Sequence, residues 1–186
     1  MNSSILFYIF ISILLIDFLF DMYLTFLNNK RFDDKIPEKL ADVYDEEAYK
    51  KSQAYKKENA NFLTITSLFS ISITLLFFFL EGFKLVDDFA RSFSNNPILI
   101  ALIFFGIMML GSDILSTPFS YYKTFVIEEK FGFNKSTKKI FWTDKLKGWL
   151  MSIVLGGGIL SIVILFYQFT GDNFWIYTWI LIAVSS

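Results

Sequence analysis

Long apolar stretches alternate with charged segments along this chain. A helix rises about 1.5 Å per residue and the hydrocarbon core of a bilayer is about 30 Å thick, so roughly 20 apolar residues cross it. Four stretches reach that length and a shorter fifth follows them: 5–27, 62–80, 97–117, 148–169 and 174–186. The pattern predicts an all-α, polytopic membrane protein with four complete transmembrane helices. The fifth would extend only about 20 Å, so we expect that span to be incomplete.

Local signals refine the ends of these helices. The first stretch has the position of a signal peptide, but no Lys or Arg precedes it and no small-x-small cleavage site follows. We therefore expect a retained helix. Asp45 is the expected N-cap of a helix that begins at Glu46, and Pro97 suits the first turn of the third span. The segment 81–96 is expected to be a short polar loop.

Positive charge is distributed unevenly between the segments that join the spans. Lys and Arg number 8 in 28–61, 2 in 81–96 and 7 in 118–147, and the turn at 171–173 has none. Because positively charged connections stay in the cytoplasm, we expect the first and third to be cytoplasmic and the N-terminus to lie outside. The block 28–61 holds as many acids as bases, and we interpret it as a solvated helical connector.

Composition supports a lipid environment and excludes several classes of function. Hydrophobic residues make up 54% of the 186 positions and 24 residues are phenylalanine, well above a soluble domain. The formal net charge of −1 provides no basic surface, so we expect no nucleic-acid partner. The chain has no histidine and no cysteine, which removes the commonest general base and the commonest zinc ligands.

Three carboxylates lie within the expected spans, Asp17 and Asp21 in the first and Asp113 in the third. A charge near the bilayer centre costs at least about 2.5–3.5 kcal/mol on insertion scales, so each carboxylate needs water or a partner. Asp17 and Asp21 are four residues apart and share one helix face. One hypothesis is a water-accessible cavity that opens toward the cytoplasm. The alternative is that Asp21 and Asp113 lie at the membrane boundary.

The stretch from Pro118 to Asn134 is denser in different chemistries than any other part of the chain. It combines aromatic residues, a turn glycine at Gly132 and adjacent carboxylates at Glu128 and Glu129, between two apolar stretches. We expect it to form a cytoplasmic loop. Adjacent carboxylates can also indicate an acid–base site.

Several motifs resemble the N-terminal part of type I CAAX prenyl proteases, which are integral-membrane zinc metalloproteases. One is Tyr49-Lys-Lys-Ser-Gln-Ala-Tyr55 with Asn59-x-Asn-Phe62, ahead of the second span. The most specific begins at Pro118-Phe-Ser-Tyr-Tyr122 and continues as Thr124-Phe-Val-Ile-Glu-Glu-Lys-Phe-Gly-Phe-Asn134. Phe174-Trp175-x-Tyr177-x-Trp179 resembles the start of the family's fifth helix. The resemblance covers essentially the whole chain.

The resemblance implies an enzyme that cuts substrates near their C-terminus, with zinc held by an H-E-x-x-H helix and a downstream glutamate. Those ligands lie beyond the family's N-terminal membrane domain and are absent from this chain, as is the C-terminal zinc peptidase domain. It therefore implies no catalytic, cofactor-binding or metal-binding residue within 1–186, and zinc only in the full-length protein. Glu128 and Glu129 then belong to an ordering loop whose aromatic residues dock onto the peptidase domain.

We accordingly expect the N-terminal membrane domain of a zinc endopeptidase, which forms part of an intramembrane chamber and a scaffold for substrate and metal domain. The implied partners are the lipid bilayer, the C-terminal peptidase domain of the same protein, and a peptide or prenylated-protein substrate. A second hypothesis is a non-catalytic membrane adaptor or regulator with this fold. A third is a small transporter that uses the intramembrane carboxylates, although no inverted repeat is visible. The membrane would be a bacterial inner membrane or the endoplasmic reticulum.

Overall fold

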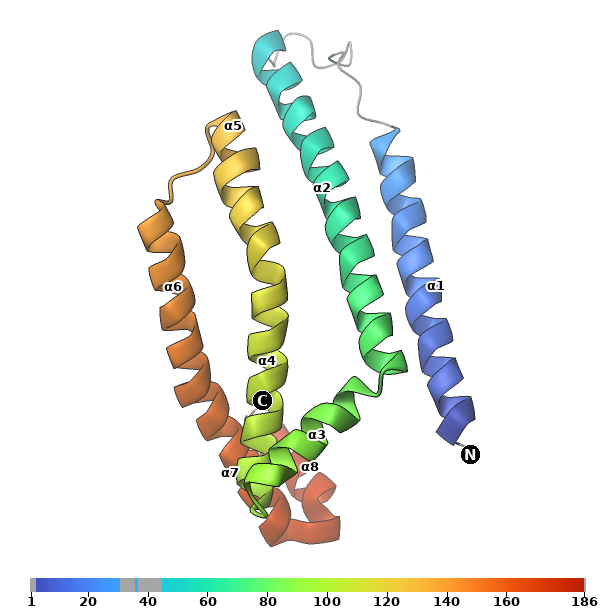
Figure 1. Ribbon diagram of the computed structural model, residues 1–186, viewed down its shortest axis with the longest axis vertical. Coiled ribbons are helices and arrows are strands. Elements are labelled where there is room, and N and C mark those ends of the chain that lie inside the picture. Colours follow the sequence, from blue (N-terminus) through green and yellow to red (C-terminus); the bar gives the residue numbers. More distant parts are fainter. Residues whose placement is uncertain (1–2, 31–35, 37–44, 186) are drawn as a thin grey trace. The chain divides into compact units, whose positions relative to one another are not determined.

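The computed structural model describes residues 3–30, 36 and 45–185. Every regular element within these residues is helical (Figure 1). The helices are α1 (Ser3–Asn29), α2 (Glu46–Phe79), α3 (Gly82–Phe93), α4 (Pro97–Tyr122), α5 (Glu129–Phe131), α6 (Lys138–Met151), α7 (Gly157–Thr170) and α8 (Phe174–Ser185). Two π-helical segments, Lys123–Glu128 and Ser152–Gly156, join α4 to α5 and α6 to α7, and a 3-10 turn, Gly171–Asn173, joins α7 to α8.

Among the described residues, four continuous helical stretches are long and apolar enough to cross a membrane. They are Ser4–Asn29, Glu46–Phe79, Pro97–Phe131 and Lys138–Thr170. The four expected complete spans are confirmed. The last three stretches have 34, 35 and 33 residues and extend well past the apolar runs, because helix continues into the adjoining polar sequence. The expected fifth span coincides with α8, whose 12 residues extend about 18 Å.

The predicted helix starts at Glu46 and Pro97 are also confirmed. The Asp45 carboxylate accepts a hydrogen bond from the Ala48 N–H at 2.9 Å, and so satisfies one of the unpaired amides at the start of α2. Asn96 plays the same part for α4, since its side-chain oxygen accepts from the Ile98 N–H at 2.9 Å. Pro97 follows as the first helical residue, where a missing N–H costs nothing.

The prediction of a polar loop over 81–96 is wrong, because most of that segment is the helix α3. Its apolar residues recur every three or four positions, as on one face of a helix, with charged residues between them. That periodicity identifies an amphipathic helix, whereas a count of charges alone does not. Glu81, with a φ of 54°, ends the preceding helical run before α3 begins.

The chain divides into two compact units. One comprises the described residues up to Leu80 together with Thr117–Lys135, and the other comprises Glu81–Ser116 with the described residues from Ser136 onward. In the first unit α1 and α2 run antiparallel, so that the Phe7 ring lies 5.6 Å from the Phe79 ring. In the second, a Cβ added at Gly157 would lie 3.5 Å from the Leu102 side chain, which explains one glycine of the Gly156–Gly158 run by close helix contact.

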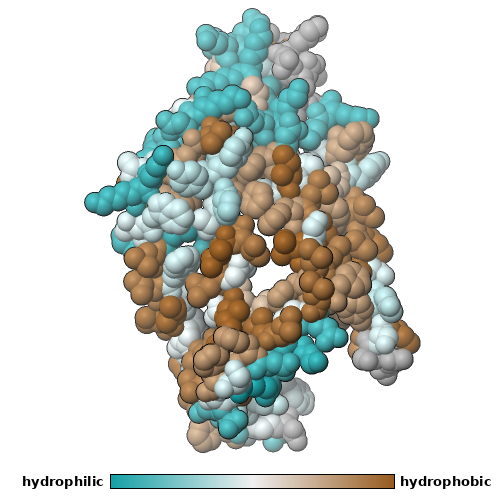
Figure 2. Space-filling view, viewed as in Figure 1, coloured by the Kyte–Doolittle hydropathy of each residue, from teal (hydrophilic) through white to brown (hydrophobic). Residues whose placement is uncertain are grey.

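Few of the described apolar side chains are buried within the protein. The buried ones are Ile11, Ala90, Ile127 and Phe131. Figure 2 shows apolar residues over the middle of the helices and hydrophilic ones over the first turns of α2. A water-soluble chain would bury such residues, but here the surrounding lipid is as apolar as the side chains and leaves them no reason to pack inward.

Candidate functional site

The stretch 118–134, expected as a loop, is almost entirely helical. Pro118 lies inside α4, the π-helical segment begins at Lys123, and the helix ends only after Phe131. In a membrane helix, backbone groups freed by a proline are satisfied by local adjustments, and the wider π-helical turn starts five residues later. The prediction missed this because polar and charged residues were equated with loop. Helical propensity of Lys, Glu and Phe does not require burial.

The helix ends at the turn predicted for Gly132. This glycine has a φ of 76°, in the left-handed region that favours glycine. The Gly132 N–H donates to the Glu129 carbonyl at 3.0 Å and the Phe133 N–H donates to the Glu128 carbonyl at 2.8 Å. This pair of bonds is a Schellman motif, in which a hydrophobic residue follows the glycine. The predicted turn residue is therefore confirmed, at the end of a helix.

The aromatic residues of this segment pack onto α2, not outward. The Tyr55 ring lies 5.2 Å from the Phe131 ring and 4.8 Å from the Phe133 ring, both edge to face. Ile127 is 1% exposed and Phe131 is 7% exposed. Phe131 is thus buried against the protein, whereas Phe133 is 51% exposed, and docking of the aromatic residues onto the peptidase domain stays a prediction. We call Tyr55, Ile127, Phe131 and Phe133 the aromatic contact.

Charged groups surround the aromatic contact. The Lys130 ammonium lies 2.5 Å from the Glu58 carboxylate of α2, and the Lys51 ammonium lies 5.8 Å from the Phe133 ring centre. The Asn134 side-chain amide donates to the Glu129 carboxylate at 2.7 Å across the turn. Glu129 therefore helps to close the turn. Glu128 contributes its backbone carbonyl to the same turn.

Further along the same face, aromatic stacking continues between α2 and the end of α4. The Phe62 ring stacks on the Tyr122 ring at 5.6 Å with an interplanar angle of 18°. The Phe119 ring lies 4.8 Å from the Phe69 ring. Such pairs add about 0.5–1.5 kcal/mol each beyond the area that they bury. The first unit thus joins α2 to the 118–134 segment along several turns.

Asp113 has charged and polar partners within the second unit. Lys145 approaches both carboxylate oxygens, at 2.6 and 2.8 Å, and the Trp149 indole N–H donates to one of them at 2.9 Å. Lys145 and Trp149 are four residues apart on α6, so both point from one face of that helix. The carboxylate is thereby held as an ion pair, with a side chain that is 32% exposed beside a lysine that is 15% exposed.

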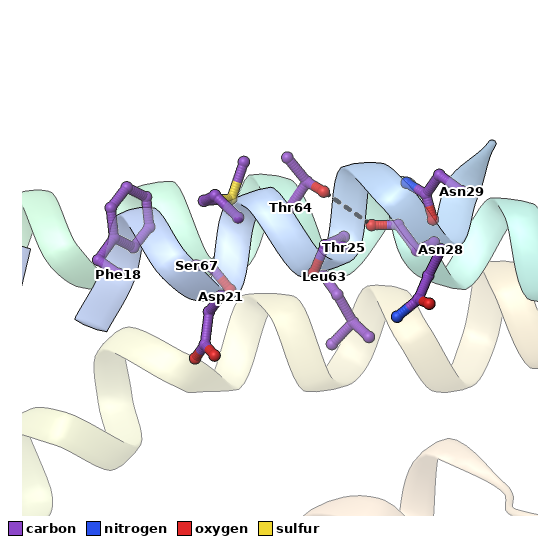
Figure 3. Close-up of a pocket in the computed structure, with 10 residues that line it drawn as sticks. Phe18, Asp21, Thr25, Asn28, Asn29, Leu63, Thr64 and Ser67 are labelled. Atoms are coloured by element: carbon purple, nitrogen blue, oxygen red, sulfur yellow. Dashed lines mark hydrogen bonds between the residues drawn. The ribbon is translucent and has the colours of Figure 1, made fainter. Parts of the chain in front are cut away.

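Asp21 lines a pocket of about 240 Å³ between α1 and α2 (Figure 3). Its polar lining combines the Asp21 carboxylate with hydroxyl and amide groups from both helices, namely Thr25, Asn28, Asn29, Thr64 and Ser67. The Thr64 hydroxyl donates to the Ala60 carbonyl at 3.0 Å, which leaves its oxygen free to accept. Asp17 is exposed on α1 and does not line this pocket. A cavity shared by all three carboxylates stays a prediction.

No zinc site fits the residues present. The chain contains neither histidine nor cysteine. Within the described ranges, no group of three or more acidic side chains is arranged to hold a metal ion. Any zinc chemistry must therefore use ligands from outside this sequence.

Comparison with known proteins identifies the family of this helical membrane chain. A family described as the CAAX prenyl protease N-terminal part, with five membrane helices, matches residues 26–186. The chain belongs to this family. The CAAX prenyl protease 1 homolog of Dictyostelium discoideum is 33% identical over 184 residues, which cover 95% of this chain and 43% of the relative. The probable CAAX prenyl protease 1 of Schizosaccharomyces pombe is 36% identical over 163 residues, 78% of this chain and 34% of the relative.

A solved structure shares the architecture of this chain. The crystal structure of S. mikatae Ste24p superposes with a TM-score of 0.85 at 29% sequence identity. The match covers 94% of this chain and 42% of that one. The chain therefore spans less than half the length of the relatives that it matches, and corresponds to their N-terminal membrane region.

Sequence reasoning identified the family segment of this chain but missed the partners that hold it. Tyr55 was recognised only as part of a motif, although the structure makes it the centre of the aromatic contact. Lys145 was counted only among the seven positive charges of 118–147, and Trp149 was not singled out. Their spacing of i and i+4 was the available signal that both could serve one acceptor.

Proposed function

We propose that this chain is the membrane scaffold of a zinc endopeptidase whose catalytic residues follow in the rest of the protein. The observation that carries the proposal is the family match over 26–186, combined with the aromatic contact built from the family's own signature residues. The relatives are named CAAX prenyl proteases, which supports a prenylated protein or peptide as the substrate. Zinc would be bound by ligands outside this sequence.

The aromatic contact is the part of the chain best suited to carry a second domain. It joins two helices, α2 and the α4–α5 stretch, in regions where each has passed beyond its apolar run. Two helical extensions held by buried Ile127 and Phe131 form a rigid support, unlike a free loop. A rigid support positions a catalytic domain and its substrate to within the small tolerance that catalysis requires.

The pocket beside Asp21 is a candidate polar position in the chamber wall. An intramembrane carboxylate that lines a cavity is by default a functional-site hypothesis. The hydroxyl and amide groups around Asp21 would tolerate water or a polar part of a substrate between α1 and α2. Asp17, one turn earlier on α1, would face the same helix side.

We further propose that the N-terminus lies outside and that the Lys-rich extensions lie in the cytoplasm. The charge counts support this orientation, and both extensions join in one aromatic contact, as two segments on the same membrane side must. The sequence has no cysteine, so Ser3→Cys and Ser136→Cys each introduce a single label site within it. A membrane-impermeant thiol reagent should label Ser3→Cys in intact cells and Ser136→Cys only after permeabilisation; the reverse pattern would refute the orientation.

The proposed function itself is tested on the full-length protein. The transcript should continue past Ser186 into an H-E-x-x-H motif, and the purified protein should cleave a prenylated CAAX peptide until a chelator removes its metal. A stop codon directly after Ser186, with a stable protein and no cleavage, would instead favour the membrane adaptor. Phe131→Ala should reduce cleavage together with stability, while the exposed Phe133→Ala should change both much less.

A further inference from the structure

Helix α3 has a surface that neither the family match nor the proposed function explains. Its residues divide into three faces when placed around a helix of 3.6 residues per turn. One face is charged and consists of Lys84, Asp87, Asp88 and Arg91. A second face includes Val86 and Ala90, of which Val86 is half-buried and Ala90 is 0% exposed. The third is an exposed apolar strip, which we define as Leu85, Phe89 and Phe93.

The side chains of the apolar strip are as exposed as many in the membrane-spanning helices, although α3 is not one of them. Leu85, Phe89 and Phe93 are 63%, 52% and 65% exposed, and they follow one another at intervals of four residues. The Phe89 and Phe93 rings touch edge to face at 4.8 Å, so they form one continuous surface. The strip lies beside the Val86–Ala90 face, through which the helix packs, and it is an apolar surface that water would disfavour.

Connectivity places this strip at a membrane surface. The helix α2 ends at Phe79 and α4 begins at Pro97, and both belong to stretches that can span the bilayer. Everything between two consecutive spans lies on one side of the membrane, within a few residues of its boundary. With 12 residues α3 extends about 18 Å, which is too short to cross, and it carries four charged residues. Figure 1 shows α3 running obliquely to α4, not as its continuation.

We propose that α3 is an interfacial helix that lies in the lipid surface and inserts Leu85, Phe89 and Phe93 below the headgroups. Its charged face points to water, and its Val86–Ala90 face packs against the protein. Helices of this kind bury their apolar side about 5–10 Å into the boundary between headgroups and acyl chains. The occupant of the strip is thus the bilayer itself, on the side to which the ends of α2 and the start of α4 lead.

The charge of α3 indicates which kind of lipid surface it suits. Lys84 and Arg91 are balanced by Asp87 and Asp88, and Arg91 donates to Asp87 at 2.7 Å. The hydrogen bond and the charge of Asp87 raise the pKa of Arg91 above its ordinary value. A neutral polar face gains little from anionic lipid, unlike the basic interfacial helices that bind it. Figure 2 shows hydrophilic residues at the position of α3, next to an apolar surface.

Spin labelling at single cysteines tests the insertion directly. Phe93→Cys places the label on the apolar strip, and Lys84→Cys, about half a turn away around the helix, is the matched control on the charged face. The full-length protein is reconstituted in phosphatidylcholine vesicles, and collisions with oxygen, which dissolves in lipid, are compared with collisions with a water-soluble nickel chelate. We expect the oxygen-to-nickel ratio to be severalfold higher for Phe93→Cys than for Lys84→Cys.

Two results would overturn the proposal. A Phe93→Cys label that is freely accessible to the nickel chelate would place the strip in water, and a label shielded from both reagents would place it against protein. Phe89→Trp provides a second measurement, in which brominated lipids should quench the indole. Adding phosphatidylglycerol should leave both signals unchanged; deeper insertion with anionic lipid would contradict the argument from neutral charge. Neither measurement depends on proteolysis or on which membrane side faces the cytoplasm.

Discussion

The contact between α2 and the α4–α5 stretch is made mainly by aromatic and aliphatic burial, whereas the contact between α4 and α6 is made around one carboxylate. In the first, Ile127 and Phe131 are buried, and the nearby Lys130–Glu58 pair is exposed mainly at its lysine, 59% against 30% for the glutamate. In the second, Asp113 receives three hydrogen bonds from Lys145 and Trp149. The two contacts belong to different compact units, and each can be described and tested independently.

This difference follows from the surroundings of each contact. Outside the apolar runs water is available, so burying aromatic area stabilises the contact and an exposed ion pair adds little. Within an expected span no water competes, so apolar burial adds little between helices and an unpaired carboxylate is costly. The same chain therefore relies on shape at one contact and on charge at the other.

The largest expected effect is at the aromatic contact. Phe131→Ala removes a ring that is 7% exposed, and we expect a loss of about 3–4 kcal/mol of unfolding free energy, because the cavity cannot refill. Phe133→Ala removes the same side chain at a position that is 51% exposed and should cost about 1 kcal/mol. Denaturant unfolding of the full-length protein in micelles compares the two. Equal losses of unfolding free energy would show that Phe131 is not the central residue of the contact.

At the carboxylate, Lys145→Met is expected to cost about 2 kcal/mol. The change removes the cation that pairs with the Asp113 carboxylate. The expected loss is below that of a fully buried pair because the Asp113 side chain is 32% exposed. Lys147→Met removes the same charge from an exposed position on α6 and should stay within about 0.5 kcal/mol.

The double variant Asp113→Asn/Lys145→Met separates charge pairing from packing. It should recover most of the stability lost in Lys145→Met, because no unpaired charge remains. Melting temperatures in detergent report the result. If the double variant is as unstable as Lys145→Met alone, then Lys145 contributes by its volume and not by its charge.

A smaller effect is expected at the turn that ends the signature segment. Gly132→Ala should cost about 1–2 kcal/mol, because the residue has a φ of 76° and an added Cβ meets nothing closer than the Lys51 ammonium at 3.9 Å. The cost is therefore one of backbone conformation. Gly111→Ala, inside α4 with no atom within 4 Å of the added Cβ, should be neutral or stabilise by up to about 1 kcal/mol. Gly132→Ala should lower the unfolding temperature, whereas Gly111→Ala should leave it unchanged or raise it.

The smallest effect is expected at the exposed ion pair of the aromatic contact. Lys130→Ala should cost less than about 1 kcal/mol, because the Lys130 side chain is 59% exposed and water screens the pair. The difference from the unchanged protein should shrink further as salt is raised in the unfolding assay. A loss that exceeds that of Phe133→Ala, or that salt does not reduce, would mean that charge contributes more here than aromatic burial.

Several features were predictable from the sequence because they depend on local properties. The four spans follow from hydropathy and length, and the cap at Asp45 and the turn at Gly132 follow from the chemistry of single residues. The family followed from the density of motifs around 118–134. The errors at 81–96 and 118–134 have one cause, since charged residues were equated with loops although both segments have helical periodicity or propensity.

The sequence alone determined that this chain enters the membrane several times, and that its carboxylates at 17, 21 and 113 would need water or a partner there. Only the tertiary structure decided what surrounds each group. Asp113 is bound by Lys145 and Trp149, and Asp21 lies in the wall of a pocket. Tyr55 is the partner of the aromatic residues at the end of the signature segment. The physical reason is that hydropathy and helix capping act over a few neighbouring residues. Partners 32 or 76 positions apart are chosen by the packing of whole helices.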